Sequence, residues 1–428
     1  MLITRASLLD GRVADIRLAG EITQLAPRLE PGRGETILDA RFGAVLPGLH
    51  DHHLHLRAAA AALESLAVGP PAVRAEAQFT RTVATAVAGT DGWIRATGYH
   101  ESVAGELNRA RLDVLQPATP MRVQHRSGAL WILNSAALAR IGHPDHVDGR
   151  LVSTDPRLGR AIPRREPDLR ALGRRLTSFG VTGVTDATPD LGPGDIDSLA
   201  TGLTQKVRCL APGKRILRDD QLDLEELSVW VAERHADDVP VALHCVTAAQ
   251  LVVAIAALRS AGRHSLDRIE HAAMVPDDCV ADLADSGVTV ITQPNFVAER
   301  GDTYRHEVPV EQHSQLWRAA SLARAGIPVA GSTDAPFGDL DPWAAMRAAV
   351  TRATASGDVL GPDERVAPLT ALQMFLGTPA RPAVLRSIAP EQPGDVCVLA
   401  PGTDEALRAL ASDMVLTTVV AGEIVEAG

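Results

Sequence analysis

The sequence predicts an α/β protein: a (β/α)8 TIM-like barrel with a small β-sandwich domain formed by both termini. Short apolar strands alternate with helices through the middle of the 428 residues. Strands that are apolar throughout are typical of parallel sheets whose faces are covered by helices. Several of these strands also end in polar side chains, which is where barrel enzymes build their active sites.

Both ends of the chain read as short strands separated by Gly and Asp turns. The N-terminal segments are LITRASLLDG, ADIRLAG and EITQLAP, and the C-terminal ones are GDVCVLAPG and MVLTTVVAGEIVEAG, with a hairpin turn expected at Ala421-Gly422. Neither end is large enough to form a stable sheet domain alone. We therefore expect residues 1–46 and 385–428 to form one composite β-domain, and residues 47–384 to form the barrel.

Strand–helix units follow one another through the middle of the chain. In order, the segments are VTGVTDAT, DIDSLATGL, KVRCLAP, KRILRD, LDLEELSVWVAERHADD, VPVALHCVT, AAQLVVAIAALRSAG, LDRIEHAAMV, PDDCVADLADSG, VTVITQPN, SQLWRAASLARAG and IPVAGSTDAPFG. Helices are expected to end at Gly262 and Gly326. About eight units are reached when VLPGL, WIRATG and MRVQHR are counted as strands, and that number favours a barrel over a doubly wound sheet.

Composition narrows the classes of protein that need to be considered. The chain is 46% hydrophobic with a formal charge of −11, which excludes a disordered chain and a basic nucleic-acid-binding face. No apolar stretch is long enough to span a bilayer. The four cysteines are far apart and form no CxxC pair, as expected for a reducing cytoplasm. We expect a small-molecule substrate and neither nucleic acid nor membrane as partner, and leave a homo-oligomer open.

Four histidines lie within six residues in the segment VLPGLHDHHLHL. Because strand side chains alternate between faces, His53 and His55 share a face with Asp51, whereas His50 and His52 share the other face. Two imidazoles on one face of a strand can chelate one metal ion. Alternation alone does not choose between the two pairs, and a histidine-rich turn is the structural alternative.

Three later strands end in further candidate ligands. His244 closes VALHCVT, His271 lies in RIEHAAMV with Glu270 expected on the opposite face, and Asp334 follows the last barrel strand. A histidine bonded within the core and an aspartate capping a helix are the structural alternatives. The repeated position at strand ends favours metal binding by His244, metal binding or orientation of the substrate by His271, and catalysis by Asp334.

Lysine is scarce, since Lys206 and Lys214 are the only two in the sequence. A carbamate formed on Lys214 could bridge two ions as a carboxylate does, and a lysine in an ion pair is the alternative. Imidazole nitrogen with hard oxygen ligands suits one or two Zn²⁺ ions, with Mn²⁺, Fe²⁺ or Co²⁺ also compatible. Such an ion lowers the pKa of bound water toward about 7. A neighbouring carboxylate can then carry the proton to a leaving nitrogen.

The motifs VLPGLHDHHLH, VTGVTDAT, LHCVT, RIEHAAMV, TQPNF, GSTDAPFG and VVAGEIVE resemble, in this order, the amidohydrolase superfamily. The segment HRSGALWILNSAAL is similar to the branch that contains N-substituted formamide deformylase. The resemblance implies metal binding by His53, His55, His244, His271 and Asp334, and proton transfer by Asp334. Its D-x-H-x-H pattern favours His53 and His55 over His50 and His52. The bridging ligand varies among members between a carbamylated lysine, Glu and Cys, so Lys214 is a provisional assignment.

The predicted function is metal-dependent hydrolysis of a carbon–nitrogen bond, that of a linear amide, by a metal-bound hydroxide, with Asp334 and His271 as catalytic residues. Deamination or opening of a cyclic amide would use the same metal site, and a non-catalytic binding scaffold is the alternative of another class. His125 and Arg126 are candidates for binding a substrate carbonyl or carboxylate. Alternatively, their segment is a structural turn that precedes a helix capped by Asn134 or Ser135.

Overall fold

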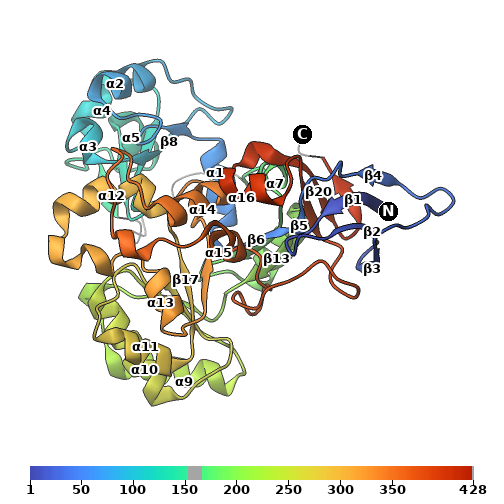
Figure 1. The fold of residues 1–428 in the computed structure, drawn as a ribbon. Coiled ribbons are helices and arrows are strands. Elements are labelled where there is room, and N and C mark those ends of the chain that lie inside the picture. The colour runs from blue at the N-terminus through green and yellow to red at the C-terminus, as the bar shows by residue number, and fades with distance from the viewer. Residues whose placement is uncertain (153–165, 427–428) are drawn as a thin grey trace. The chain divides into compact units, whose positions relative to one another are not determined.

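The computed structural model describes residues 1–152 and 166–426, which form a mixed α/β protein of two compact units. Unit 1 comprises Met1–Leu56 and Leu169–Gly428, and unit 2 comprises Arg57–Asp168 (Figure 1). The expected boundaries at 46/47 and 384/385 stay predictions, but residues 47–384 are divided between the two units.

Unit 1 contains two parallel sheets. One has the order β13-β12-β6 and the other β14-β15-β16-β17-β18. Their strands are β6 (Leu49–Leu54), β12 (Val181–Asp186), β13 (Lys206–Cys209), β14 (Lys214–Ile216), β15 (Ala242–Cys245), β16 (Arg268–His271), β17 (Thr289–Thr292) and β18 (Val329–Gly331). Just beyond β18, the Asp334 amide donates to the His53 carbonyl at 2.9 Å, and the His55 amide donates to the Ala335 carbonyl at 2.8 Å. These bonds join the carboxyl ends of β6 and β18.

Helices cover the outward face of the second sheet. An apolar layer packs against Leu227, Val231, Leu251, Ile255 and Leu283 from the helices. It is formed by Leu243, Ile269 and Val290 from the strands and by Leu217, which follows β14. The helices of unit 1 that follow its strands are α7 (Leu169–Ser178), α8 (Pro193–Gly202), α9 (Leu224–Ala236), α10 (Ala248–Ala261), α11 (Cys279–Ser286), α12 (Asn295–Glu307), α13 (Ala320–Arg324), α14 (Pro342–Thr351), α15 (Pro368–Gln373) and α16 (Thr403–Ala409). Short 3-10 turns occur at Asp219–Gln221, Val310–Gln315, Pro362–Glu364 and Ser412–Met414.

Helix boundaries agree with the local sequence signals in most cases. The Asp223 side chain caps α9 by accepting from the Glu226 amide. Gly262 ends α10 with a φ of +88°, a conformation that glycine adopts without steric cost. The helix expected to end at Gly326 is shorter than predicted, because Trp317 has a φ of +50° and α13 begins only at Ala320.

The two ends of the chain form adjoining sheets in unit 1. Their orders are β3-β2-β1-β4 and β21-β20-β19-β5. The strands are β1 (Leu2–Ser7), β2 (Val13–Leu18), β3 (Ile22–Ala26), β4 (Ile37–Asp39), β5 (Val45–Pro47), β19 (Val396–Leu399), β20 (Val415–Val420) and β21 (Glu423–Val425). One apolar cluster contains Ile3, Ile16, Val45, Val398 and Val419, so residues from both ends share a core.

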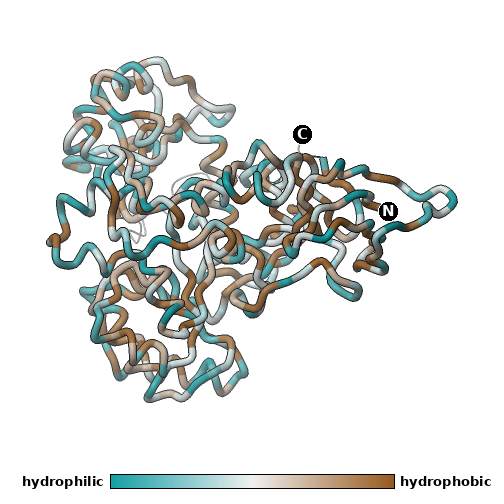
Figure 2. The backbone as a smooth tube through the Cα atoms, in the orientation of Figure 1, coloured by the Kyte–Doolittle hydropathy of each residue, from teal (hydrophilic) through white to brown (hydrophobic). Residues whose placement is uncertain are grey.

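Figure 2 shows the same arrangement in the hydropathy of the residues. The strands of the two terminal sheets are largely hydrophobic (brown), and the tip of the β3–β4 loop is hydrophilic (teal). The hairpin turn predicted at Ala421-Gly422 is confirmed. Both residues have a positive φ, and Val420 pairs with Glu423 across the turn.

Unit 2 contains a sheet of its own, in the order β11-β10-β9-β8-β7. Its strands are β7 (Leu66–Ala67), β8 (Ile94–Tyr99), β9 (Met121–His125), β10 (Leu130–Leu133) and β11 (Arg150–Val152). Its helices are α1 (Leu56–Leu63, which begins at the last residue of unit 1), α2 (Glu76–Ala84), α3 (Glu101–Ala104), α4 (Arg109–Leu115) and α5 (Ser135–Arg140). The segments WIRATG and MRVQHR therefore form β8 and β9. These strands are parallel to each other but belong to this sheet and not to those of β6 and the later strands, so counting them among the barrel strands was wrong.

Among the described residues, none of the helices combines the length and apolar character needed to cross a membrane.

Candidate metal centre

Strand β6 places His53 and His55 at the carboxyl end of its sheet. All residues of β6 are buried, and His55 follows the strand with a side chain that is 17% exposed. The strand carries an irregularity, since Val184 pairs with Asp51 but Asp186 pairs with Leu54. Between these pairs β6 holds one residue more than β12, which is the definition of a β-bulge. The grouping expected from alternation still holds, because His53 and His55 both face Asp334 and the His52 ring stacks on that of His50.

His50 and His52 have different surroundings from His53. The His50 ring packs where a Cβ at Gly183 would lie, and its Nε2 is 2.8 Å from the Thr185 hydroxyl. The His52 ring stacks on His50 with centroids 4.6 Å apart. His50 and His52, the alternative pair of ligands, therefore pack against each other and against β12.

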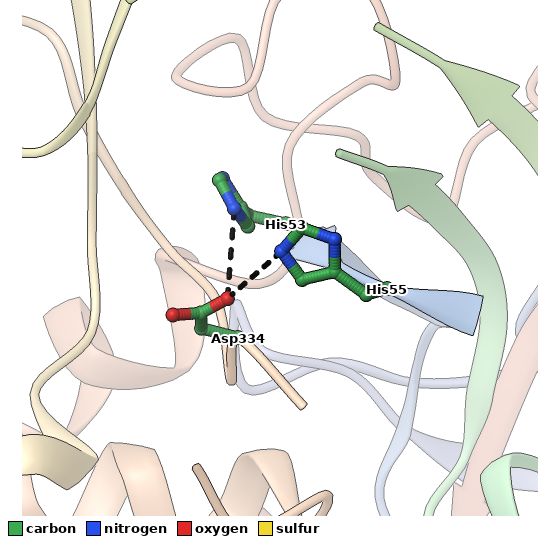
Figure 3. A group of neighbouring side chains, drawn as sticks. All are labelled: His53, His55 and Asp334. Carbon is green, nitrogen blue, oxygen red and sulfur yellow. Dashed lines mark ion pairs between the residues drawn. The ribbon is translucent and has the colours of Figure 1, made fainter. Parts of the chain in front are cut away.

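Asp334 faces both His53 and His55 (Figure 3). Its Oδ1 lies 3.6 Å from Nε2 of His53 and 3.5 Å from Nε2 of His55. The three ligand atoms lie within 4.8 Å of one another. Within residues 1–152 and 166–426, neither His53 Nε2 nor Asp334 Oδ1 has a hydrogen-bond partner, although both atoms are buried. Buried polar atoms are normally paired, so these atoms fit a shared cation.

His271 and His244 complete the ring of histidines. The His271 ring centroid lies 4.8 Å from that of His53 and 4.5 Å from that of His244. Nδ1 of His271 lies 2.9 Å from Oε1 of Gln293, whose amide group donates to the Ser332 hydroxyl at 2.8 Å. Gln293 therefore accepts from Nδ1–H and leaves Nε2 of His271 as the nitrogen able to bind a metal.

Glu270, which sequence alternation placed on the opposite face from His271, also reaches the centre. Its Oε2 forms a short contact with Nδ1 of His53, and its carboxylate also accepts from the Arg268 guanidinium at 2.7 and 3.1 Å. Glu270 and His271 both reach the centre because His271 has a φ of +71°, which ends the extended backbone. Glu270 orients the His53 ring so that Nε2 faces Asp334, a common arrangement around metal-binding histidines.

Asp51 ties the carboxyl ends of β6 and β18 together. Its Oδ1 accepts from the amides of His53 and Thr333 at 3.2 Å each, and its Oδ2 accepts from the Thr333 hydroxyl. Burial raises the pKa of Asp51 to about 7, against the opposing effect of these hydrogen bonds. The bonds hold Thr333, and hence its neighbour Asp334, in fixed register with His53. Asp334 itself has a φ of +55°, and such strained backbone recurs at functional sites.

Lys214 is buried at the start of β14. Its ammonium nitrogen has no hydrogen-bond partner in the described part of the chain. Burial lowers its pKa to about 8, although the charges of Glu270 and Asp334 oppose that shift. A lysine with this pKa carries an appreciable fraction of neutral amine near pH 7 to 8, and the neutral amine is the form that combines with CO₂.

The buried histidines are neutral at physiological pH. Burial lowers the pKa of His53 and His271 well below the usual value, and neighbouring cations and rings act in the same direction. The pKa of His244 falls to about 3, first through burial and then through charges that include Lys214 and Arg218. Neutral imidazole is the form that binds metal ions.

His125 and Arg126 belong to unit 2, and their predicted role in substrate binding stays a prediction. Nε2 of His125 lies 3.0 Å from Oε2 of Glu101, which also lies 4.0 Å from Nε2 of His100. Both rings use Nδ1 to accept from the amide of a serine two residues later, Ser102 or Ser127. That bond places the proton of a neutral ring on Nε2, from which His125 can donate a hydrogen bond to the Glu101 carboxylate. Asn134 caps α5, as one sequence alternative expected.

Histidines and a carboxylate at the carboxyl ends of parallel strands define the type of site found in metal-dependent hydrolases. The chain belongs to the amidohydrolase family, whose model matches residues 36–426. The family assignment expected from the sequence motifs is therefore confirmed.

Three similar proteins illustrate the range of the match. N-substituted formamide deformylase of Arthrobacter pascens is 29% identical over 123 residues, which are 28% of this chain and 23% of the deformylase. An uncharacterised metal-dependent hydrolase from Pyrococcus horikoshii OT3 has a TM-score of 0.71 at 18% identity, covering 93% of this chain and 97% of the other. A mutant atrazine chlorohydrolase from Arthrobacter aurescens TC1, solved with zinc, has a TM-score of 0.50 at 14% identity, covering 99% and 94%.

The contact between Glu270 and His53 generates a prediction about metal affinity. Glu270→Gln should weaken metal binding by about 10- to 100-fold, because the amide orients the His53 ring less firmly than the carboxylate. Glu299→Gln is the matched control, since Glu299 is a half-buried glutamate bonded to Asn295 and the Asp339 amide. Competition with a chromophoric chelator measures both affinities. Equal affinity in the two variants would show that Glu270 does not position the ligand.

Proposed function

We propose that this protein is a metal-dependent amidohydrolase that cleaves the carbon–nitrogen bond of a linear amide. The observation that carries the proposal is the convergence of His53, His55 and Asp334, with His53 Nε2 and Asp334 Oδ1 buried and, among the described residues, unpaired. Membership of the amidohydrolase family and the partial match to a formamide deformylase support the reaction class.

The donor set fits a divalent cation. His53, His55, His244 and His271 offer imidazole nitrogens, and Asp334 offers a carboxylate, a combination that suits Zn²⁺ best and Mn²⁺, Fe²⁺ or Co²⁺ less well. When bound, such an ion lowers the pKa of water toward about 7 and polarises a substrate carbonyl. A carbamate on Lys214 would add a carboxylate ligand and could hold a second ion.

Asp334 is the residue placed to move the proton. Its carboxylate can accept a proton from the attacking water and return it to the leaving nitrogen, as a general base followed by a general acid. His271 lies beside it, with Nδ1 3.8 Å from Asp334 Oδ2. Neutral His271 can bind the ion or orient the substrate carbonyl without competing for the proton, because burial keeps its pKa low.

The fold places these groups at one end of the strands. We propose that the sheets β13-β12-β6 and β14-β15-β16-β17-β18 close into one (β/α)8 barrel, supported by the bonds between β6 and the segment after β18. The residues above then lie at the carboxyl-terminal face, where barrel enzymes bind substrates. The terminal sheets would pack as a small sandwich over their shared apolar cluster.

We place the protein in the cytoplasm with a small-molecule substrate. The four cysteines are free thiols in the structure, as expected where disulfides do not persist. Deamination or cyclic-amide opening on the same residues, and a non-catalytic scaffold, are the alternatives that experiment must separate.

Activity against a panel of amides tests the proposal. Metal-stripped protein should be inactive, and protein reloaded with Zn²⁺ should hydrolyse members of a panel of N-formyl and N-acyl amides, because the ion supplies the charge that activates water. Asp334→Asn should lower kcat by about 10²- to 10⁴-fold, the usual contribution of general acid–base catalysis. Turnover confined to cyclic amides or amino-substituted rings would favour the alternative reactions, and a protein that binds no metal would favour the scaffold.

Lys214 separates a one-metal from a two-metal centre. If its carbamate bridges two ions, Lys214→Arg should lower the metal stoichiometry from two toward one, because a guanidinium cannot form the carbamate. At equal concentrations of dissolved CO₂, decarbamylated wild type should be reactivated faster at pH 8.5 than at pH 6.5, since the pKa of about 8 leaves more neutral amine at the higher pH. Metal analysis of the purified proteins measures the stoichiometry.

Lys206→Arg is the control, because Lys206 forms an ion pair with Asp395. Full metal content and activity in Lys214→Arg would rule out the carbamate.

A further inference from the structure

Arg218 lies two residues beyond β14, on the face of the chain that carries Lys214. Ile216 pairs with His244 in the parallel ladder between β14 and β15. The next residue, Leu217, packs into the apolar layer beneath the helices with Leu243 and Leu227. Because Arg218 has an extended backbone (φ −133°, ψ 135°), its side chain leaves the opposite face from Leu217. Lys214, Ile216 and Arg218 therefore follow one another on the face turned toward the metal centre.

Exposure changes along this face. Lys214 is 5% exposed, Ile216 is 40% exposed, and Arg218 is exposed. Exposure therefore increases along this face, from Lys214 at the buried centre to Arg218 at the solvent-exposed edge beyond His244. The positive charge of Arg218 reaches His244, where it adds to the larger effect of burial in lowering the pKa of that ring.

The Arg218 guanidinium is not committed to another part of the protein. Across residues 1–152 and 166–426 it forms no ion pair or side-chain hydrogen bond. The adjacent Asp219 accepts from the Thr247 hydroxyl at 2.7 Å and from the Gln250 amide at 2.9 Å. The neighbouring Arg215 differs, because it pairs with Glu226 at 2.7 Å and lies over the Trp230 ring. In a chain with net charge −11, an arginine without a carboxylate partner beside a catalytic centre is available for a ligand.

We propose that Arg218 binds a carboxylate of the substrate, so that the preferred substrates are amides that carry a free carboxylate, such as N-acyl amino acids. This inference rests on the proposed amidohydrolase function. A planar guanidinium matches a carboxylate through two parallel hydrogen bonds. A single arginine suits a monoanion, since Lys214 is buried and Arg215 is engaged elsewhere. Binding the carboxylate at the rim would leave the amide group free to extend toward Asp334.

The test compares matched acids and amides. N-formyl, N-acetyl and N-benzoyl amino acids are assayed beside the corresponding N-acyl amino-acid amides, in which a neutral carboxamide replaces the carboxylate. The Zn²⁺-loaded wild type should show a higher kcat/KM for the acids. Arg218→Ala should reduce that preference by roughly 10- to 100-fold, the value of a hydrogen-bonded charge pair, mainly through KM. Arg218→Lys should retain part of it, and Arg215→Ala should retain all of it.

A binding measurement distinguishes failure of this inference from failure of the proposed function, because it does not depend on hydrolysis. Isothermal titration of the Zn²⁺-loaded proteins with N-benzoylglycine and N-benzoylglycinamide measures the same preference without turnover. Tighter binding of the acid by the wild type, lost in Arg218→Ala, supports the inference even if no amide is hydrolysed. Hydrolysis with equal preference for acid and amide, or a preference that survives Arg218→Ala, overturns the inference and leaves the amidohydrolase function standing.

Discussion

The candidate centre depends on donor atoms that are buried and that the described part of the chain leaves unpaired. His53 Nε2, Asp334 Oδ1 and Lys214 Nζ are all in this state. Each unsatisfied buried polar group costs about 1 to 3 kcal/mol, so a protein keeps several together only where something else pairs with them. A divalent cation is the partner that satisfies two imidazoles and a carboxylate at once.

Neighbouring side chains make this arrangement rigid. They bind the ring nitrogens of His53 and His271 that do not face the candidate metal site. Glu270 contacts Nδ1 of His53, and Gln293 accepts from Nδ1 of His271. Asp51 holds the backbone of Thr333 next to Asp334. The free lone pairs are consequently those that point inward. Arg268 neutralises the charge of Glu270 at 2.7 Å, which allows a carboxylate to remain in a buried position.

One departure from regular strand geometry brings Glu270 to the same centre as His271. His271 has a positive φ, which directs these two successive residues to one centre. A backbone feature of this kind depends on the surrounding fold. A sequence read with strict alternation predicted the right segment at VLPGLHDHHLHL but the wrong side for Glu270.

Other parts of the fold were predictable because their signals are local. The hairpin at Ala421-Gly422 and the end of α10 at Gly262 depend on residues that favour a positive φ. The assignment of β8 and β9 to unit 2 was not predictable, because an apolar strand does not reveal which sheet it joins. The family was predictable from the order of its motifs. The metal ligands and Lys214 stay predictions, and Arg218 stood out only once its strand face was known.

An anomalous difference map from crystals grown with Zn²⁺, measured above the zinc absorption edge, tests the central claim most directly. The account predicts a peak about 2.0 to 2.2 Å from Nε2 of His53, Nε2 of His55 and an oxygen of Asp334. A peak only at His100, Glu101 and His125 in unit 2, or none near His53, would contradict it.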